Sequence, residues 1–184
     1  MTEVIDVTQS DLLKGKKVLI VDDEPDVIAA LVELLPECRI MKAFTFSEGK
    51  ELLESQNPDL AILDIMGVNG FKLLDIANDR KVVAVMLTAQ ALSPESTIKA
   101  YKRGAAFFVP KEEMGKITSF LKDVLKAKER GENYWSTWLD SLGAYYDRKF
   151  GPDWKDKDRE FWDALARKEW RLASVLRKEE YSDE

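Results

Sequence analysis

Three carboxylates follow two short apolar runs, and their types and spacing could do chemistry. Asp22 and Asp23 come directly after the run 18–21, and Asp64 comes directly after the run 60–63. Continuous runs of four apolar residues are typical of parallel strands that are buried on both faces. Because the carboxyl ends of parallel strands share one edge of a sheet, we expect the three acids to meet there. Such a cluster normally needs a cation, and oxygen ligands suit Mg²⁺.

Two further apolar runs deliver polar groups to the same edge. The run 82–87 ends at Thr88, and the run 105–109 is followed by Pro110 and Lys111. A metal and an ammonium can neutralise the oxygens of a phosphoryl group, and a hydroxyl can donate a hydrogen bond to one of them. One carboxylate then remains to attack phosphorus. Each feature alone has a simpler explanation as a cap or a solvated side chain, but their arrival in order favours a site.

The elements that must position these groups alternate between strand and helix patterns. Five βα units predict an α/β fold, a doubly wound five-stranded parallel sheet with helices on both faces. The expected strands are 17–22, 39–44, 59–64, 81–87 and 105–109. The expected helices begin at Pro25 and near Ser47, which we predict as a cap, and then cover 70–78, 94–103 and 112–129.

The order of these motifs resembles the receiver domain of bacterial two-component response regulators. Four motifs in sequence at the expected separations are far more specific than a single short match. The resemblance covers residues 16–130 and implies a flavodoxin-like receiver with strand order 2-1-3-4-5. The matching stretches are 18–25, 63–66 with 69–71, 87–89 and 104–111.

The resemblance implies a role for each acid at the predicted site. Asp64 is similar to the phospho-acceptor of the family. Asp22 and Asp23 are similar to the acidic pair that holds Mg²⁺, together with Asp64 and the backbone carbonyl of Met66. The implied protein is a self-phosphorylating and self-dephosphorylating switch, not a conventional enzyme.

The resemblance also assigns the phosphate-binding and switch residues. Lys111 is similar to the phosphate-binding lysine, Thr88 to the switch hydroxyl and Phe108 to the switch aromatic. The chain has no histidine, so it cannot supply its own phospho-histidine donor. The phosphoryl group is therefore expected to come from a partner histidine kinase or a small phospho-donor.

Two loops depart from the family pattern. The usual loop after the acceptor, Asp-x-x-Met-Pro-x-x-Asp/Asn-Gly, is two residues longer than here, and its proline is missing; Gly67 and Gly70 can supply a tight turn. Glu112 stands where proline usually follows Lys111, and a cis bond to Glu112 would be costly. We expect an intact ligand set within remodelled loops, which leaves the lifetime of the phosphoryl group open.

Composition narrows the class and the compartment. The chain has 184 residues, a net charge of −6 and a pI near 5.0, so it has no general attraction to nucleic acid or anionic membranes. A single cysteine, Cys38, excludes an internal disulfide and fits a reducing compartment. Neither a membrane span nor a signal peptide is evident. We expect a cytoplasmic protein.

The chain divides into three parts by sequence character. Residues 1–15 are a leader in which Val4, Ile5 and Val7 could add a strand or pack on the sheet, residues 16–130 are the receiver domain, and residues 131–184 are a helical, aromatic-rich extension. The extension holds every tryptophan of the chain: Trp135, Trp138, Trp154, Trp162 and Trp170.

The extension is predicted to be a helical hairpin. Amphipathic patterns cover 133–149 and 157–179, with Gly151 and Pro152 between them and Asp156 or Asp158 as a cap. Two helices cannot bury so many aromatic side chains by themselves. Their apolar face must rest on the chain's own receiver, on a second copy as a homodimer, or on another protein, and the sequence does not separate these.

The charge of the extension bears on the output. It carries 10 Lys and Arg residues against 13 Asp and Glu residues, so the excess positive charge of a DNA-binding surface is missing. We therefore expect signalling by contact with a downstream protein. A transcription regulator that uses these helices on DNA, a phosphorelay shuttle and a scaffold that is never phosphorylated remain as alternatives.

Overall fold

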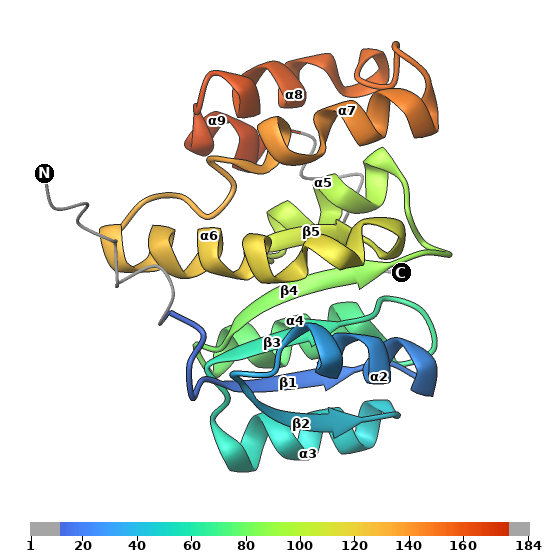
Figure 1. Cartoon of the computed structure of the whole chain (residues 1–184). Helices are drawn as coiled ribbons and strands as arrows, with labels where there is room; N and C mark the ends of the chain where they lie inside the picture. Colours follow the sequence, from blue (N-terminus) through green and yellow to red (C-terminus); the bar gives the residue numbers. More distant parts are fainter. Residues whose placement is uncertain (1–11, 177–184) are drawn as a thin grey trace, which may run out of the picture.

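A parallel sheet of five strands forms the centre of the molecule in the computed structural model, which describes residues 12–176 (Figure 1). The strands pair in the order β2-β1-β3-β4-β5, and each neighbouring pair is parallel. The predicted doubly wound sheet and its strand order are confirmed. The strands are β1 (Lys17–Val21), β2 (Arg39–Ala43), β3 (Leu60–Leu63), β4 (Val83–Thr88) and β5 (Phe107–Pro110).

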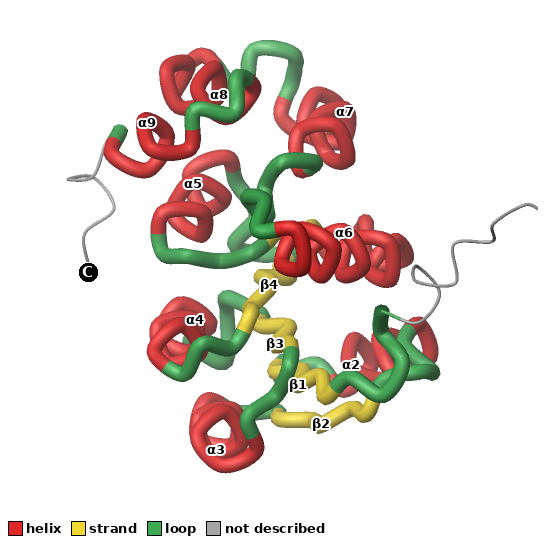
Figure 2. The backbone as a smooth tube through the Cα atoms, turned by 90° about the vertical axis from the view of Figure 1, so that its left-hand side faces the viewer, coloured by secondary structure: helices red, strands yellow, loops and turns green. Residues whose placement is uncertain are grey.

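Helices cover both faces of this sheet (Figure 2). On one face lie α2 (Pro25–Leu34) and α6 (Ile117–Arg130). On the other lie α3 (Phe46–Gln56), α4 (Gly70–Asp79) and α5 (Pro94–Lys102). All four residues of β3 are buried, as a continuous apolar run requires when a strand is covered on both sides.

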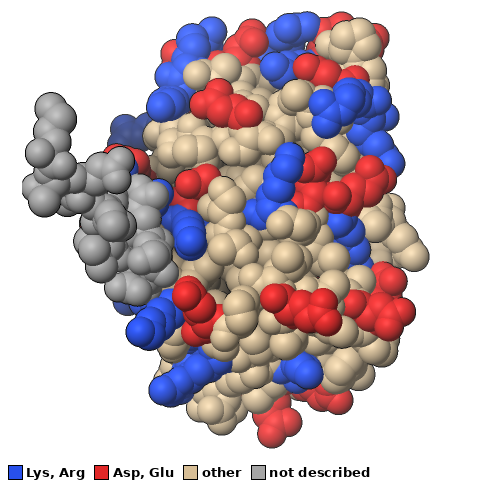
Figure 3. All heavy atoms as spheres, in the orientation of Figure 1, with Lys and Arg blue, Asp and Glu red and all other residues tan. Residues whose placement is uncertain are grey.

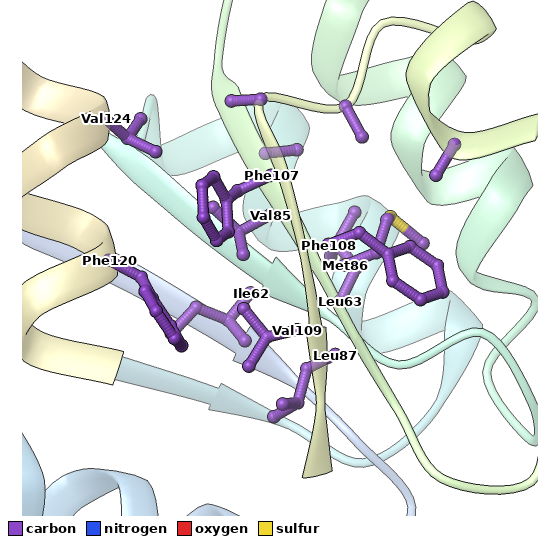
Figure 4. Packing of buried hydrophobic residues seen from close by; sticks show 14 of the residues in the cluster. Ile62, Leu63, Val85, Met86, Leu87, Phe107, Phe108, Val109, Phe120 and Val124 are labelled. Carbon is purple, nitrogen blue, oxygen red and sulfur yellow. The ribbon is translucent and has the colours of Figure 1, made fainter. Parts of the chain in front are cut away.

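The side chains of β5 divide between the two faces. Phe107 points toward α6, where its ring stacks on Phe120 with centroids 5.1 Å apart. Phe108 points to the opposite face, beside Met86 and Leu63 (Figure 4). This alternation follows from the two-residue period of a strand. Phe108 is therefore a core residue beneath α5.

The start of α3 corrects one prediction. Its N-cap is Thr45 and not Ser47, because Thr45 has extended backbone and its side chain accepts from the amide of Glu48, three residues later. The hydroxyl of Thr45 accepts a hydrogen bond from the amide of Glu48 at 3.2 Å, and the Glu48 carboxylate accepts one from the amide of Phe44 at 2.7 Å. Ser47 already lies inside the helix, which begins at Phe46.

The helix expected over 112–129 has a different beginning. Residues Lys111–Lys116 form a short 3₁₀ helix, η1, and the α-helix α6 starts only at Ile117. Gly115 lies inside η1, where its low helix propensity weakens a regular α-helical turn. Among the residues that the structure describes, no peptide bond is cis, as expected for the bond to Glu112.

The extension contains more and shorter helices than the predicted hairpin. Its elements are α7 (Trp138–Phe150), the 3₁₀ helix η2 (Asp156–Asp158), α8 (Arg159–Ala166) and α9 (Trp170–Val175). The helix expected over 133–149 is wrong at its start, because the side chain of Asn133 accepts a hydrogen bond from the amide of Trp135 and holds a turn there.

The helix expected over 157–179 is also wrong, because it is divided at Lys168. Lys168 has a left-handed φ of 58°, and the amide of Glu169 donates to the carbonyl of Ala164. This pattern closes α8 and starts a new helix. Asp158 does occupy the N-cap position of α8, although its side chain makes no capping hydrogen bond there. Residues 177–179, like Val4, Ile5 and Val7 of the leader, lie outside the described residues.

The aromatic face of the extension rests on its own receiver domain. In Figures 1 and 2 the helices α7, α8 and α9 lie beside α5, at the β5 end of the sheet. The indole of Trp135 donates a hydrogen bond to the carbonyl of Ala105 at 2.7 Å, and the indole of Trp138 donates one to the carbonyl of Phe108 at 2.9 Å. Both bonds are buried. Of the three occupants left open by the sequence, the structure selects the first.

None of the helices in residues 12–176 is both long enough and apolar enough to cross a bilayer.

Candidate functional site

Four carboxylates meet at the carboxyl edge of the sheet. Asp22, Asp23 and Glu24 follow β1, and Asp64 follows β3, the strand paired beside it with Val21 opposite Leu63. One carboxylate oxygen from each of the four lies within 4.8 Å of the others. The three acids predicted to converge do so, and Glu24 joins them.

Lys111 lies at the centre of these acids. Its ammonium nitrogen is 2.9 Å from Oδ2 of Asp22, 2.9 Å from Oε1 of Glu24 and 3.3 Å from Oδ2 of Asp64. Lys111 directly follows β5, so this strand delivers the only lysine that is ion-paired with the cluster in the described part of the chain. One ammonium balances only part of the charge of four carboxylates.

The backbone fixes the orientation of the two buried acids. Oδ1 of Asp22 accepts a hydrogen bond from the amide of Glu24 at 2.9 Å, and Oδ1 of Asp64 accepts one from the amide of Ile65 at 2.9 Å. In both residues Oδ2 is the oxygen that faces Lys111. Each side chain is therefore held at one oxygen and presents the other to the site.

Burial and charge perturb the ionisation of both partners. Burial, together with the charge of Asp22, raises the pKa of Asp64 to about 6 despite the opposing effect of Lys111. Burial alone would lower the pKa of Lys111, but the carboxylates of Glu24, Asp22 and Asp64 together raise it above its ordinary range. Negative charge at this edge is thus in excess, and a bound cation would relieve it.

A pocket of about 150 Å³ opens over the acids. Met66, which is half exposed, lies on its wall. The pocket is large enough for a small oxyanion and ordered water. Its lining residues are Asp23, Glu24, Asp64, Met66, Gly67, Gln90 and Lys111.

The shortened loop after Asp64 depends on its two glycines. Gly67 has a φ of +85°, and a Cβ placed there would lie 2.4 Å from Oδ2 of Asp23. A Cβ on Gly70 would lie 1.9 Å from the backbone oxygen of Asp64. Neither position accepts a side chain without movement of an acidic residue of the site. Close approach of the loop backbone therefore compensates for its short length.

The two predicted switch residues lie behind the acids and not in the pocket lining. Thr88 ends β4, is fully buried, and its hydroxyl accepts a long hydrogen bond, 3.4 Å, from the amide of Ala91. Phe108 is fully buried and pairs in register with Met86. The structure therefore brings Asp22, Asp23, Asp64, Met66 and Lys111 together, with Thr88 at the neighbouring strand end.

Three residues that line this pocket, Glu24, Gly67 and Gln90, were not predicted as site residues from the sequence. Glu24 was visible as a third acid directly after β1, which is a usable signal. Gly67 was noted for its turn but not for its contact with Asp23. Gln90 follows Thr88 by two residues in an irregular loop, and no pattern in the sequence marks it.

The chemistry of the donor set fits a magnesium ion. Every candidate ligand in the described cluster is a carboxylate oxygen, and two of the acids are exposed enough for water to complete an octahedron. A divalent cation would also relieve the charge excess that raises the pKa of Asp64. A cluster of this kind suits a hard cation such as Mg²⁺ better than zinc or copper, because histidine and thiolate ligands are absent from it.

The chain is similar in sequence to curated response regulators. It is 36% identical over 100 residues to the heme response regulator HssR of Staphylococcus aureus, which is 50% of this chain and 43% of that protein. It is 29% identical over 139 residues to the response regulator GtcR of Aneurinibacillus migulanus, which is 70% of this chain and 57% of that protein. The chain thus spans about half the length of the curated relatives it matches.

Solved structures and a family model agree with these relatives. A CheY-like receiver domain protein from Methanospirillum hungatei is 25% identical, with a TM-score of 0.58 over 64% of this chain and 99% of its own. The Francisella response regulator 1452 receiver domain shares the fold at 22% identity and a TM-score of 0.56, over 62% of this chain and 99% of its own. The model for the response regulator receiver domain matches residues 18–122, so this chain belongs to the response regulator receiver domain family.

Proposed function

We propose that this protein is a phosphorylation switch in which Asp64 receives a phosphoryl group from a partner histidine kinase or a small phospho-donor. The observation that carries the proposal is the contact of Lys111 with both Asp64 and Asp22 inside a cluster of four acids. A structural ion pair would need one acid for one lysine. Four acids around one ammonium suit a site that also takes a cation and a phosphoryl group.

The reaction is an in-line displacement at phosphorus. A carboxylate oxygen of Asp64 forms the new bond to phosphorus, while the bond to the leaving group breaks and the leaving group keeps the electron pair. The ammonium of Lys111 moves from the carboxylates onto a phosphoryl oxygen. The hydroxyl of Thr88 donates a hydrogen bond to another phosphoryl oxygen. Positioning and charge neutralisation carry the rate, so the protein needs no general base.

Magnesium belongs to this proposal as a cofactor. Asp22, Asp23, Asp64 and the backbone carbonyl of Met66 would hold Mg²⁺ at the pocket. When bound, the ion supplies positive charge that neutralises the phosphoryl oxygens during transfer. Asp22 and Asp23 would hold the ion beside the acceptor, and the amide of Ile65 holds Asp64 at its other oxygen.

The proposed output is contact with a downstream protein inside the cytoplasm, and the switch is not a conventional enzyme. Its charge supports this choice over nucleic acid. Over the face drawn in Figure 3, basic and acidic side chains alternate along the extension, without a continuous basic stripe.

Mass measurement on the intact protein tests the assignment of Asp64. With Mg²⁺ and acetyl phosphate, the wild type should gain one phosphoryl group that is lost in acid, as an acyl phosphate is. The Asp64→Asn variant should gain none, and chelation of Mg²⁺ should suppress the gain in the wild type. Equal labelling of the wild type and of Asp64→Asn would contradict the proposal.

A further inference from the structure

The extension is attached to the receiver domain beside α5, at the β5 end of the sheet. Beyond the aromatic contacts, its buried polar bonds reach α5, β5 and Ala105 in the loop between them. Exposed ion pairs such as Lys149 with Glu112 add little to this attachment. The buried bonds of Trp138 and Tyr146 are the ones that lie nearest to the site.

The first of these bonds fixes β5. The indole of Trp138 donates to the backbone carbonyl of Phe108 at 2.9 Å, and Trp138 is fully buried. Phe108 lies in β5, and Lys111, three residues later, is the first residue after that strand. The ammonium that must move onto a phosphoryl group is thus carried by a strand whose backbone the extension holds.

The second bond fixes the first turn of α5. The hydroxyls of Tyr146 and Thr97 are 2.6 Å apart, and Thr97 donates its single proton to the carbonyl of Ser93 at 2.7 Å. Tyr146 must therefore be the donor to Thr97. Ser93 is the N-cap of α5, and the short loop before it leads back to Thr88. The extension thus holds α5 at one end of the loop whose other end follows Thr88.

The two aromatic residues form one unit. Their rings meet edge to face with centroids 4.9 Å apart, and Trp162 stacks on Trp138 from α8 at 5.8 Å. A shift of either β5 or α5 must therefore disturb the packing of the whole unit, because close-packed side chains do not deform continuously.

We propose that Trp138 and Tyr146 are positioning residues for the phosphorylation switch, and that they favour its unphosphorylated conformation. The inference rests on the proposed function of Asp64. A phosphoryl group in the pocket must draw Lys111 away from Asp22 and Glu24 and draw Thr88 toward Asp64. Both movements displace backbone that the two aromatic residues hold.

The coupling has to act in both directions. If docking of the extension opposes phosphorylation, phosphorylation must loosen the docking by the same factor. Loss of one buried hydrogen bond between neutral groups changes an equilibrium about fivefold. We expect changes of this size when either bond is removed.

Three conservative variants of the full-length protein separate this role from general stability. Trp138→Phe removes the indole N–H at Phe108 but keeps an aromatic ring. Tyr146→Phe removes only the hydroxyl that reaches Thr97, and it serves as a second variant if Trp138→Phe folds poorly. Trp154→Phe is the matched control, because the indole of Trp154 donates to Asp147 within the extension, at 2.7 Å, and not to the receiver.

The readouts are the phosphorylated fraction at limiting acetyl phosphate and amide hydrogen exchange over α7 and α8, each with Mg²⁺ present. Trp138→Phe and Tyr146→Phe should raise the phosphorylated fraction about fivefold, while Trp154→Phe matches the wild type. Mg²⁺ affinity without the donor should be the same in all four proteins. Phosphorylation of the wild type should speed exchange in α7 about fivefold, whereas an Asp64→Asn protein treated alike should show no change.

The outcomes distinguish the two proposals. If acetyl phosphate does not modify Asp64, the proposed function fails and this inference falls with it. If Asp64 is modified but exchange in α7 stays unchanged, the function stands and the positioning role is wrong. The role is also wrong if Trp138→Phe, Tyr146→Phe and Trp154→Phe all label to the same extent as the wild type.

Discussion

The acidic site and the aromatic extension differ in what their side chains present to one another: charge at the site, and apolar rings in the extension. At the site, four carboxylates surround one ammonium, two of the acids are exposed, and the pKa of Asp64 is raised to about 6. In the extension, Trp138 and Trp162 are almost wholly buried, stack on each other, and are packed among further rings. The first region has unbalanced charge that a ligand can relieve, and the second is held together by the packing of its rings.

This difference separates function from stability in the molecule. A ligand changes the energy of the acidic site most, because burial and repulsion already strain it. The extension contributes burial of large aromatic side chains, at about 1.5–3 kcal/mol each. The two regions meet at β5, where Lys111 serves one and the carbonyl of Phe108 serves the other. Changes to the two regions should therefore have opposite signs on stability.

Deletion of residues 131–184 should have the largest effect. It uncovers the apolar surface of α5 and β5, including Tyr101, whose ring meets Trp135 and Phe161 edge to face. We expect a loss of at least about 3–5 kcal/mol, the cost of removing even one buried aromatic side chain, with lowered solubility. Thermal melting and light scattering measure both. A truncated receiver that stays monomeric and as stable as the full chain would show that the extension does not stabilise the receiver domain.

Substitution of Gly67 should act on the site without touching the extension. In Gly67→Ala the new Cβ meets the Asp23 carboxylate at a backbone conformation that L-residues rarely adopt. We expect Mg²⁺ affinity to fall about tenfold, as measured by calorimetry, for a displacement that costs about 1.4 kcal/mol.

Gly115→Ala is the control for that substitution. Gly115 has no heavy atom within 4 Å of the position where its Cβ would lie, and its φ is not in the left-handed region. Its Mg²⁺ affinity should match the wild type. Equal affinity in Gly67→Ala would mean that Asp23 either moves freely or is not a ligand.

Neutralisation of Asp64 should stabilise the protein in the absence of metal. The folded pKa of about 6 lies above the unfolded value of 3.8, so the favourable contribution of Asp64 is fully present below about pH 4 and is lost as pH rises through 6. In chelator at pH 7.5, Asp64→Asn should be more stable than the wild type by about 2 kcal/mol.

The stability difference for Asp64→Asn should shrink toward pH 4, and chemical denaturation at several pH values measures it. Glu54→Gln removes an exposed carboxylate on α3, away from the acidic cluster, and serves as the control. A gain that persists unchanged at pH 4 would show that charge is not its cause.

The smallest expected effect concerns nucleic acid. The extension has more acidic than basic residues, and its aromatic face is covered by its own receiver. We expect no gel shift with random duplex DNA at physiological salt and micromolar protein. Binding in that range would instead favour a transcription regulator.

The site could be predicted from the sequence because its residues stand at strand ends. A buried strand shows itself as an apolar run, and the parallel sheet then brings Asp22, Asp23, Asp64 and Lys111 to one edge whatever the loops do. The loops were harder, because the contact of Gly67 with Asp23 depends on backbone geometry that no spacing reports. Glu24 was overlooked because exposed acids after a strand usually have no such role.

The extension could be predicted only in part for a physical reason. Aromatic periodicity shows that a face must be buried, but not against what, since burial of apolar surface is non-directional. The docking partner is decided by bonds such as Trp135 to Ala105, between positions far apart in the chain. The break at Lys168 was missed because its left-handed conformation has no glycine or asparagine to signal it.

Location of the phosphoryl group within the chain tests the central claim most directly. After treatment with Mg²⁺ and acetyl phosphate, borohydride reduction converts a phosphorylated aspartate into homoserine, and peptide mass mapping then finds its position. We expect homoserine at residue 64 alone. Homoserine at another acid of the cluster, or a fully modified protein with unchanged Asp64, would contradict it.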